Sequence, residues 1–217
     1  DLDRAATAAA YGIFFNQGEM CSAASRLVVH ESVRDPLLEK IVEIGRTMMP
    51  GDPLDPKTRL GAIVDQVQLN TVLAFIESGR RQGANLRFGG NRACIESGGY
   101  FVEPTVFDNV TMQMKIAREE IFGPVLSAIT FKDVDEAVRI ANDVSYGLTA
   151  AVWSRDITTA HRVAKALRAG TVYVNSYDAC DITVPFGGFK QSGNGRDKSL
   201  HAMDKYTELK TTWIDLS

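Results

Sequence analysis

The sequence predicts an α/β fold: a mostly parallel sheet flanked by helices. Short runs rich in β-branched residues alternate along the chain with amphipathic stretches of helical period. This alternation is typical of βαβ units, whose strands run parallel. No internal repeat, low-complexity tract or clear linker interrupts the 217 residues. One α/β domain is therefore the simplest organisation of the chain.

The first half of the chain supplies three helices and three strands. They are expected at helix 3–15, strand 25–30, helix 32–48, helix 65–82, strand 85–88 and strand 101–107. Asn16-Gln17-Gly18 ends the first helix, and Ser32 is expected to cap the second. The third helix should turn Val67, Val72, Leu73 and Ile76 inward. Gly89–Gly99 is expected to be a loop or hairpin tip.

The second half repeats the alternation and ends differently. We expect strand 125–131, helix 134–142 capped by Asp133, strand 149–153, helix 157–167 and strand 171–175. A long glycine-rich loop follows, and residues 208–214 form one more strand. A strand left over at a chain end often pairs with a partner chain. We therefore divide the chain into a domain over residues 1–205 and an oligomerisation strand within residues 206–217.

Composition excludes several classes of protein. The net charge is −3, and no dense Lys/Arg cluster predicts a nucleic-acid partner. The apolar runs are too short for a membrane span, and no signal segment opens the chain. Three widely spaced cysteines and three isolated histidines offer neither a disulfide framework nor metal-ligand spacing. These features favour a cytoplasmic protein without a metal, a nucleic-acid partner or a membrane.

The start of the chain is unusual. Asp1-Leu2-Asp3 has no initiator Met and runs directly into an Ala-rich helical stretch. We therefore expect the chain to be part of a longer protein.

The most informative stretch surrounds Cys21. In FFNQGEMCSA, residues 14–23, a helix stops, the chain turns through Gly18, and a cysteine follows among small residues. Small neighbours leave room for a substrate, and a cysteine in a turn can offer its own backbone N–H to an oxyanion. Most lone cysteines, however, are inert core residues. The residues alone leave both interpretations open.

Four blocks carry a resemblance to a known family. FFNQGEMCSAASR, residues 14–26, resembles the active-site cysteine signature of the aldehyde dehydrogenase superfamily. EEIFGPV (119–125), GTVYVN (170–175) and PFGGFKQSG (185–193) resemble that family's cofactor segment, a late strand and the loop beside the substrate channel. The ending FGGFKQSGNGRDKSLHAMDKYTELKTTWI is most similar to bacterial γ-glutamyl-γ-aminobutyraldehyde or guanidinobutyraldehyde dehydrogenases.

The resemblance implies a nucleophile and a reaction. Cys21 falls on the family's catalytic cysteine, whose thiolate attacks an aldehyde to give a thiohemiacetal. The Cys21 N–H would be one donor to the oxyanion. Hydride transfer to NAD or NADP then leaves a thioester, which water converts to a carboxylic acid.

The resemblance also assigns binding residues. Glu120 matches the glutamate that holds the nicotinamide-side ribose hydroxyls, and Phe122 would pack on the same ribose. Phe15 and Phe186 fall on aromatic positions of the substrate channel. Asp178 and Asp181 lie in the family's variable substrate-anchoring loop, residues 177–181, where they would favour a cationic aminoaldehyde or guanidinoaldehyde. The residues alone are equally consistent with solvated loop acids. Cys180 in this loop would be a spectator.

Several expected parts of the enzyme are not in this chain. The glycines of residues 187–193 are followed by Asn194 rather than by Lys, and no GxGxxG fingerprint occurs. The family's cofactor-binding domain, the Asn of its oxyanion hole and its general-base Glu should lie upstream of Asp1. Glu19 matches a different position of the motif. We expect the isolated chain to fold but to be nearly inactive, and the whole enzyme to be a homodimer or homotetramer.

Two other functions stay open at this stage. An acylating or semialdehyde dehydrogenase would use the same thioester with a different acceptor. A non-catalytic interaction module would keep the fold without the chemistry.

Overall fold

The computed structural model describes residues 1–179 and 181–217. The first half contains helices α1 (Leu2–Phe14), α2 (Arg34–Thr47) and α3 (Gln66–Arg81) and strands β1 (Arg26–His30), β2 (Asn85–Phe88), β3 (Arg92–Ala93), β4 (Phe101–Val102) and β5 (Thr105–Asp108). The second half contains helices α4 (Lys115–Arg118), α5 (Val134–Asn142) and α6 (Ile157–Ala166) and strands β6 (Val125–Phe131), β7 (Tyr146–Gly147), β8 (Thr149–Val152), β9 (Thr171–Val174) and β10 (Phe189–Lys190). Short 3₁₀ segments lie at Phe15–Gly18, Glu31–Val33, Ile95–Ser97 and Leu200–Lys205.

The main sheet has the strand order β1-β6-β5-β2. β1 and β6 pair in parallel, as do β5 and β6, whereas β2 pairs antiparallel with β5. This arrangement confirms the predicted α/β class with a mostly parallel sheet.

Helices cover both faces of this sheet. Strand residues alternate between faces, so Leu126 and Ala128 of β6 pack with α1 and α2, while Val125 and Ile129 pack with α3. Each face therefore has its own apolar core, and β6 is buried from both sides. Its sequence, VLSAITF, is largely apolar, and its buried Ser127 donates to the Ile116 carbonyl, as suits a parallel strand covered on both faces.

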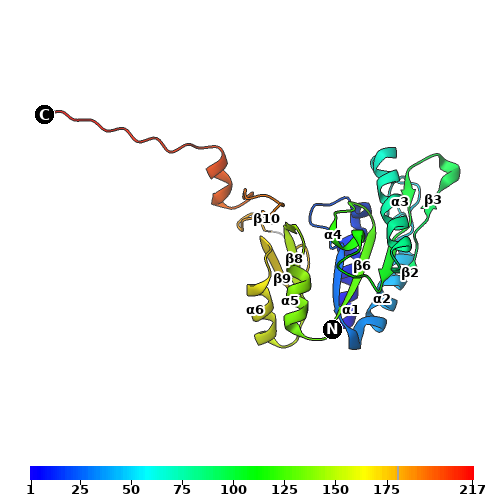
Figure 1. Ribbon diagram of the computed structural model, residues 1–217. Coiled ribbons are helices and arrows are strands. Elements are labelled where there is room, and N and C mark those ends of the chain that lie inside the picture. The colour runs from blue at the N-terminus through cyan, green and yellow to red at the C-terminus, as the bar shows by residue number, and fades with distance from the viewer. Residues whose placement is uncertain (180) are drawn as a thin grey trace.

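A smaller part lies beside the main sheet. Strands β8 and β9 pair in parallel, and helices α5 and α6 contact each other. Helix α5 also contacts β1 and β6 and so joins the two parts. Figure 1 shows this smaller part, in light green to yellow, beside the main sheet. The elements at 134–142, 149–152, 157–166 and 171–174 confirm the predicted alternation to within a residue or two.

Three local predictions were wrong. Ser32 does not cap α2, because a 3₁₀ turn precedes the helix and Val33 occupies the cap position without a side-chain bond. Val67 is 73% exposed in the first turn of α3. The strand expected at 101–107 is divided between β4 and β5 at Glu103-Pro104, since proline has no N–H to donate to a ladder.

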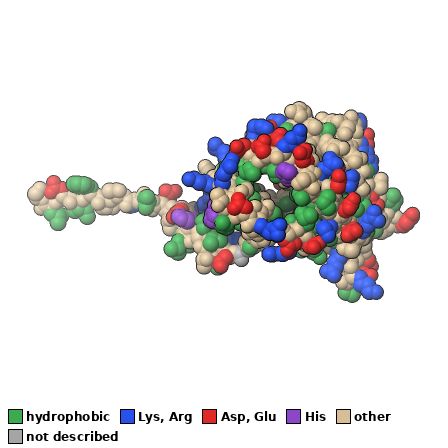
Figure 2. Space-filling model, turned by 90° about the horizontal axis from the view of Figure 1, so that it is seen from below, with side chains coloured by type: hydrophobic (Ala, Val, Ile, Leu, Met, Phe, Trp, Pro, Cys, Tyr) green, Lys and Arg blue, Asp and Glu red, His purple; other side chains and the backbone are tan. Residues whose placement is uncertain are grey.

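The C-terminal segment extends away from the body. Residues 207–217 form neither helix nor strand in this single chain and are exposed. Figure 1 shows the segment projecting from the fold, and Figure 2 shows apolar side chains along it. The oligomerisation strand expected within 206–217 stays a prediction. In the described part of the chain, no helix is long and apolar enough to cross a bilayer.

Candidate active site

Cys21 lies exposed in a tight turn after α1 and the 3₁₀ segment Phe15–Gly18. The turn covers Met20–Ala23 and is closed by the Ala23 N–H, which donates to the Met20 carbonyl over 3.0 Å. The next residue, Ser22, is 6% exposed, and its carbonyl accepts from the Tyr177 hydroxyl and from Thr149 Oγ1. The Cys21 N–H donates to no described residue. The turn therefore presents the thiol beside an unused backbone donor.

The path from α1 to Cys21 is built from left-handed residues. Asn16, Gln17 and Gly18 have φ of 48°, 58° and 72°. Such a conformation costs an L-residue with a side chain about 1–2 kcal/mol. Gly18 is required for a second reason, because a Cβ there would lie 2.2 Å from the Gly123 carbonyl oxygen. The backbone of the cysteine loop thus touches the Glu120–Gly123 segment, so two distant motifs meet in space.

Glu120 and Phe122 are both exposed on that segment. Phe122 has φ of 53°, and its carbonyl accepts from Gln68 Nε2 over 2.8 Å. The same Gln68 nitrogen donates to the Ile121 carbonyl over 2.9 Å. Helix α3 therefore fixes the segment that presents the predicted ribose ligands. Gln68 was not anticipated, since no pattern in the sequence links the first turn of a helix to a loop 53 residues later.

A cavity of about 270 Å³ opens beside the cysteine turn, between α1 and the loop after β9. Its walls are Ala8, Tyr11, Gly12, Phe15, Met20, Ser22, Ala23, Tyr177 and Asp178. Cys21 stands between two wall residues, Met20 and Ser22. The structure thus brings Phe15 and Asp178 together at the cysteine.

The other predicted substrate residues lie away from this cavity. Phe186 pairs with Asp197 through the backbone, and the Lys198 ammonium lies 5.3 Å from the centre of its ring. Asp181 accepts from the backbone and hydroxyl of Thr183, and these bonds lower the pKa of its carboxyl group. Cys180 lies outside the described residues. Roles for Phe186 and Asp181 stay predictions.

Tyr177 was missed by the sequence reasoning, although its neighbour Asp178 was named. Burial raises the pKa of its hydroxyl to about 12, with smaller contributions from Asp178, Tyr173 and Cys21. The hydroxyl is therefore neutral at physiological pH and donates to the Ser22 carbonyl. Tyr11 lies four residues before Phe15, and helical spacing alone would have placed both on one face.

Glu19 does not lie among the cavity walls. Its Oε1 accepts the Val64 N–H over 3.1 Å. Burial raises the pKa of its carboxyl group, and Asp65 adds to this increase. The expectation that another residue is the general base stays a prediction.

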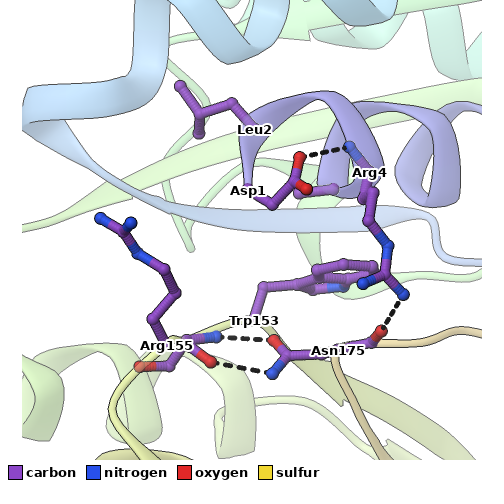
Figure 3. A pocket seen from close by; sticks show the side chains of 8 residues that line it. Asp1, Leu2, Arg4, Trp153, Arg155 and Asn175 are labelled. Carbon is purple, nitrogen blue, oxygen red and sulfur yellow. Dashed lines mark hydrogen bonds between the residues drawn. The ribbon is translucent and has the colours of Figure 1, made fainter.

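A second cavity, of about 240 Å³, opens at the start of α1 and is shown in Figure 3. Asn175 lies in its wall, and its amide bonds the backbone N–H and carbonyl of Ser154. The Arg4 guanidinium donates to the Asn175 carbonyl over 3.4 Å. These bonds fix the end of β9, from which the Tyr177 loop departs. No predicted site residue lines this cavity.

No group of three or more potential metal ligands occurs in the described part of the chain.

Comparisons with known proteins identify the family of the chain. The family model described as "Aldehyde dehydrogenase family" matches residues 1–212. The chain is 48% identical to the NADP/NAD-dependent aldehyde dehydrogenase PuuC of Escherichia coli, covering all of this chain and 43% of that protein. The solved structure of the aldehyde dehydrogenase KauB from Pseudomonas aeruginosa is 63% identical, with a TM-score of 0.96 over all of this chain and 44% of that one.

A third relative agrees with the expected subfamily. The structure of a γ-glutamyl-γ-aminobutyraldehyde dehydrogenase from Burkholderia cenocepacia is 62% identical, with a TM-score of 0.94, and covers 98% of this chain and 43% of that one. The chain thus spans less than half the length of the proteins it matches. With the exposed cysteine in its turn and a family match over nearly every residue, the chain belongs to the aldehyde dehydrogenase family.

Proposed function

We propose that this chain supplies the nucleophile of an NAD(P)-dependent enzyme that oxidises an aldehyde to a carboxylic acid. One observation carries the proposal: Cys21 is exposed between Met20 and Ser22, which line a cavity, and its own N–H has no acceptor in the described residues. Membership of the family and the NADP/NAD dependence of the E. coli relative support the assignment.

The chemistry follows from the position of Cys21. Its sulfur adds to the aldehyde carbon, a C–S bond forms, and the carbonyl electron pair moves to oxygen. The Cys21 N–H donates to this oxyanion. A nicotinamide cofactor bound beside Glu120 and Phe122 would supply the acceptor for the hydride that the carbon loses. Water then cleaves the thioester on Cys21, which releases the acid and restores the thiol.

Glu120 and Phe122 suit the nicotinamide-side ribose. The Glu120 side chain makes no hydrogen bond or ion pair with the described residues, so both carboxylate oxygens are open to hydroxyl donors. The Phe122 ring is 39% exposed, while its carbonyl is held by Gln68. This combination of a free carboxylate and an anchored, exposed ring fits a sugar.

The cavity suits an aldehyde with a cationic end, such as an aminoaldehyde. Tyr11, Phe15 and Tyr177 give it aromatic walls, and Asp178 adds one acid. Aromatic faces and a carboxylate both attract an ammonium group. Asp181 and Phe186 would act farther along the channel.

We also propose a homo-oligomer and a cytoplasmic location. The exposed apolar segment after residue 205 would pair with a second copy. A reducing compartment would keep the Cys21 thiol free for catalysis.

The test is Cys21-dependent formation of NADH or NADPH from a panel of aldehydes. Because the Asn of the oxyanion hole, the general-base Glu and most of the cofactor site are expected outside this chain, turnover should be very low and should vanish in Cys21→Ala. Cys94→Ala is the matched control and should behave as the parent chain. Equal turnover in Cys21→Ala would overturn the proposed nucleophile, and rapid turnover by the parent would contradict the expected near inactivity.

A further inference from the structure

The loop that carries Cys21 is tied to residues 61–64 by side-chain hydrogen bonds. Gln17 Oε1 accepts the Gly61 N–H over 3.0 Å, and Gln17 Nε2 donates to the Ala62 carbonyl over 3.2 Å. In a third hydrogen bond between the two segments, Glu19 Oε1 accepts the Val64 N–H. The Gln17 amide thus bonds two consecutive residues, one through its oxygen and one through its nitrogen. These partners lie 44 and 45 positions later in the sequence.

Residues 61–64 are held in place by the rest of the fold. Ile63 is 2% exposed, and its N–H donates to the Tyr100 carbonyl over 2.7 Å. Leu60, just before, is 1% exposed. Asp65, just after, caps α3 through the Gln68 N–H. Burial and hydrogen bonds therefore fix the strip on both sides of the residues that Gln17 binds.

The loop itself has few other ways to hold its shape. Asn16 and Gln17 are both left-handed residues with side chains, which is an uncommon pair. Within the loop, the Glu19 N–H donates to the Asn16 carbonyl, and Asn16 Nδ2 donates to the Glu19 carbonyl. These bonds close the loop on itself, whereas Gln17 is the residue that bonds the loop twice to a fixed part of the fold. Such strain persists where the surroundings impose it.

We infer that Gln17 is a positioning residue for Cys21, and the inference rests on the proposed role of Cys21 as nucleophile. By docking the loop on Gly61 and Ala62, Gln17 sets the orientation of the Cys21 turn and of its backbone N–H. Stabilisation of an oxyanion depends on the direction of the donor, whereas simple alkylation of a thiol does not. Loss of the docking should therefore slow acylation of Cys21 more than alkylation.

The experiment compares two reactions of Cys21 in the parent chain and in Gln17→Met. Acylation by p-nitrophenyl acetate needs no cofactor: the thiolate displaces p-nitrophenolate and becomes an acetyl thioester. Alkylation by iodoacetamide needs only an accessible thiolate. Both adducts are quantified at Cys21 and at Cys94 by peptide mass spectrometry. We expect acylation of Cys21 in Gln17→Met to fall at least about tenfold, with alkylation unchanged within about twofold.

Two further variants sharpen the test. Gln17→Glu keeps an acceptor for the Gly61 N–H but places a second acceptor against the Ala62 carbonyl, so acylation should fall here too. Gln113→Met is the matched control, because Gln113 is exposed and makes no hydrogen bond to the described residues. It should acylate like the parent. Gln17→Glu also provides the test if Gln17→Met fails to fold.

Each outcome either supports or overturns the positioning role of Gln17. Selective loss of Cys21 acylation supports the positioning role. Equal acylation in parent and Gln17 variants overturns that role and leaves the proposed nucleophile intact. Cys94 reports on the rest of the fold, because its Sγ donates to the Pro50 carbonyl. If acylation of Cys94 changes in parallel with that of Cys21, the Gln17 variants have destabilised the fold in general, and the positioning role is overturned. If parent Cys21 is not acylated while Cys94 is, the proposed nucleophile fails and the inference falls with it.

Discussion

At the scale of single residues, Gly18 joins the cysteine loop to the Glu120–Gly123 segment. Its φ is 72°, and the space where a Cβ would stand is filled by the Gly123 carbonyl. Gly98 has nearly the same φ, 73°, but a Cβ there would meet nothing within 4 Å. Comparing alanine substitutions at Gly18 and Gly98 therefore separates the free-energy cost of the left-handed backbone from the cost of a clash with Gly123.

We expect Gly18→Ala to be clearly more destabilising than Gly98→Ala. The left-handed backbone alone should cost about 1 kcal/mol in Gly98→Ala. The contact with Gly123 should bring the loss in Gly18→Ala to about 3 kcal/mol or more. Urea unfolding of both variants measures the difference. Equal losses would contradict the close approach of the two segments.

Tyr177 should make stability depend on pH in the alkaline range. Its hydroxyl has a pKa of about 12 in the folded chain, above its ordinary value, chiefly because of burial. The folded state therefore favours the neutral hydroxyl. The stabilisation is complete below about pH 10 and is lost as the pH rises toward 12. A shift of this size corresponds to roughly 3 kcal/mol.

Tyr177→Phe tests this prediction, since it keeps the ring and removes the ionising group. At pH 8 the variant should be less stable by about 1 kcal/mol, because the Ser22 carbonyl loses its donor. Between pH 10 and 12 the parent should lose stability relative to the variant. Unfolding free energies of both chains across this range provide the measurement. Parallel pH curves would rule out the shifted hydroxyl.

At the scale of elements, the C-terminus of α5 ties the two parts of the molecule together. Arg26 of β1 donates to the carbonyls of Ile140 and Ala141 over 3.2 and 2.9 Å. Lys190 of β10 donates to the carbonyls of Asn142 and Val144. Two cations thus donate to carbonyls at the end of α5 and just after it, where the negative end of the helix dipole attracts positive charge.

Replacing Arg26 should loosen α5 before the main sheet. Arg26→Met keeps the apolar stem and removes both bonds, so we expect a loss of about 2 kcal/mol. Arg139→Met is the matched control, because the Arg139 side chain is 67% exposed on the same helix and should cost under about 0.5 kcal/mol. Hydrogen exchange should show faster opening of α5 in Arg26→Met, with amides of β6 changed less. Equal effects of the two variants would refute this anchoring role.

The elements that local pattern determines were predicted from sequence. Helices at 66–81 and 134–142 follow Asp65 and Asp133, whose carboxylates accept N–H groups of the first turn. Strands β1 and β6 follow from β-branched runs between turns. What failed depends on neighbours in space. His30 accepts the Ser32 N–H at the start of the 3₁₀ turn ahead of α2, and its other ring nitrogen bonds the Lys132 carbonyl, 102 positions away. This turn leaves Ser32 outside the helix cap.

The candidate site divides in the same way. Cys21, Glu120 and Phe122 lie in short motifs that a linear sequence displays. Gln17, Gln68 and Tyr177 matter through partners 44 to 155 positions away. Their residue types are ordinary at such places, so only the folded chain shows their contacts. The left-handed φ of Asn16 and Gln17 is likewise imposed by docking.

At the scale of the whole molecule, the C-terminal segment has apolar surface that this chain does not cover. Leu209, Trp213, Ile214 and Leu216 are each at least 73% exposed. Residues 208–217 make no hydrogen bond or ion pair with the rest of the described chain. An apolar, extended segment with open backbone groups is a typical template for pairing with another chain.

We therefore expect the chain to self-associate through this segment. Trp213→Ser with Ile214→Ser should weaken association at least about tenfold, because two large apolar side chains lose their burial. Thr211→Ser with Thr212→Ser is the matched control in the same segment and should associate like the parent. Because the segment does not touch the body, the thermal midpoint of the dilute monomer should move by less than about 1 °C in either variant. Sedimentation across a concentration series measures association, and a parent chain that stays monomeric at high concentration would refute pairing through the segment.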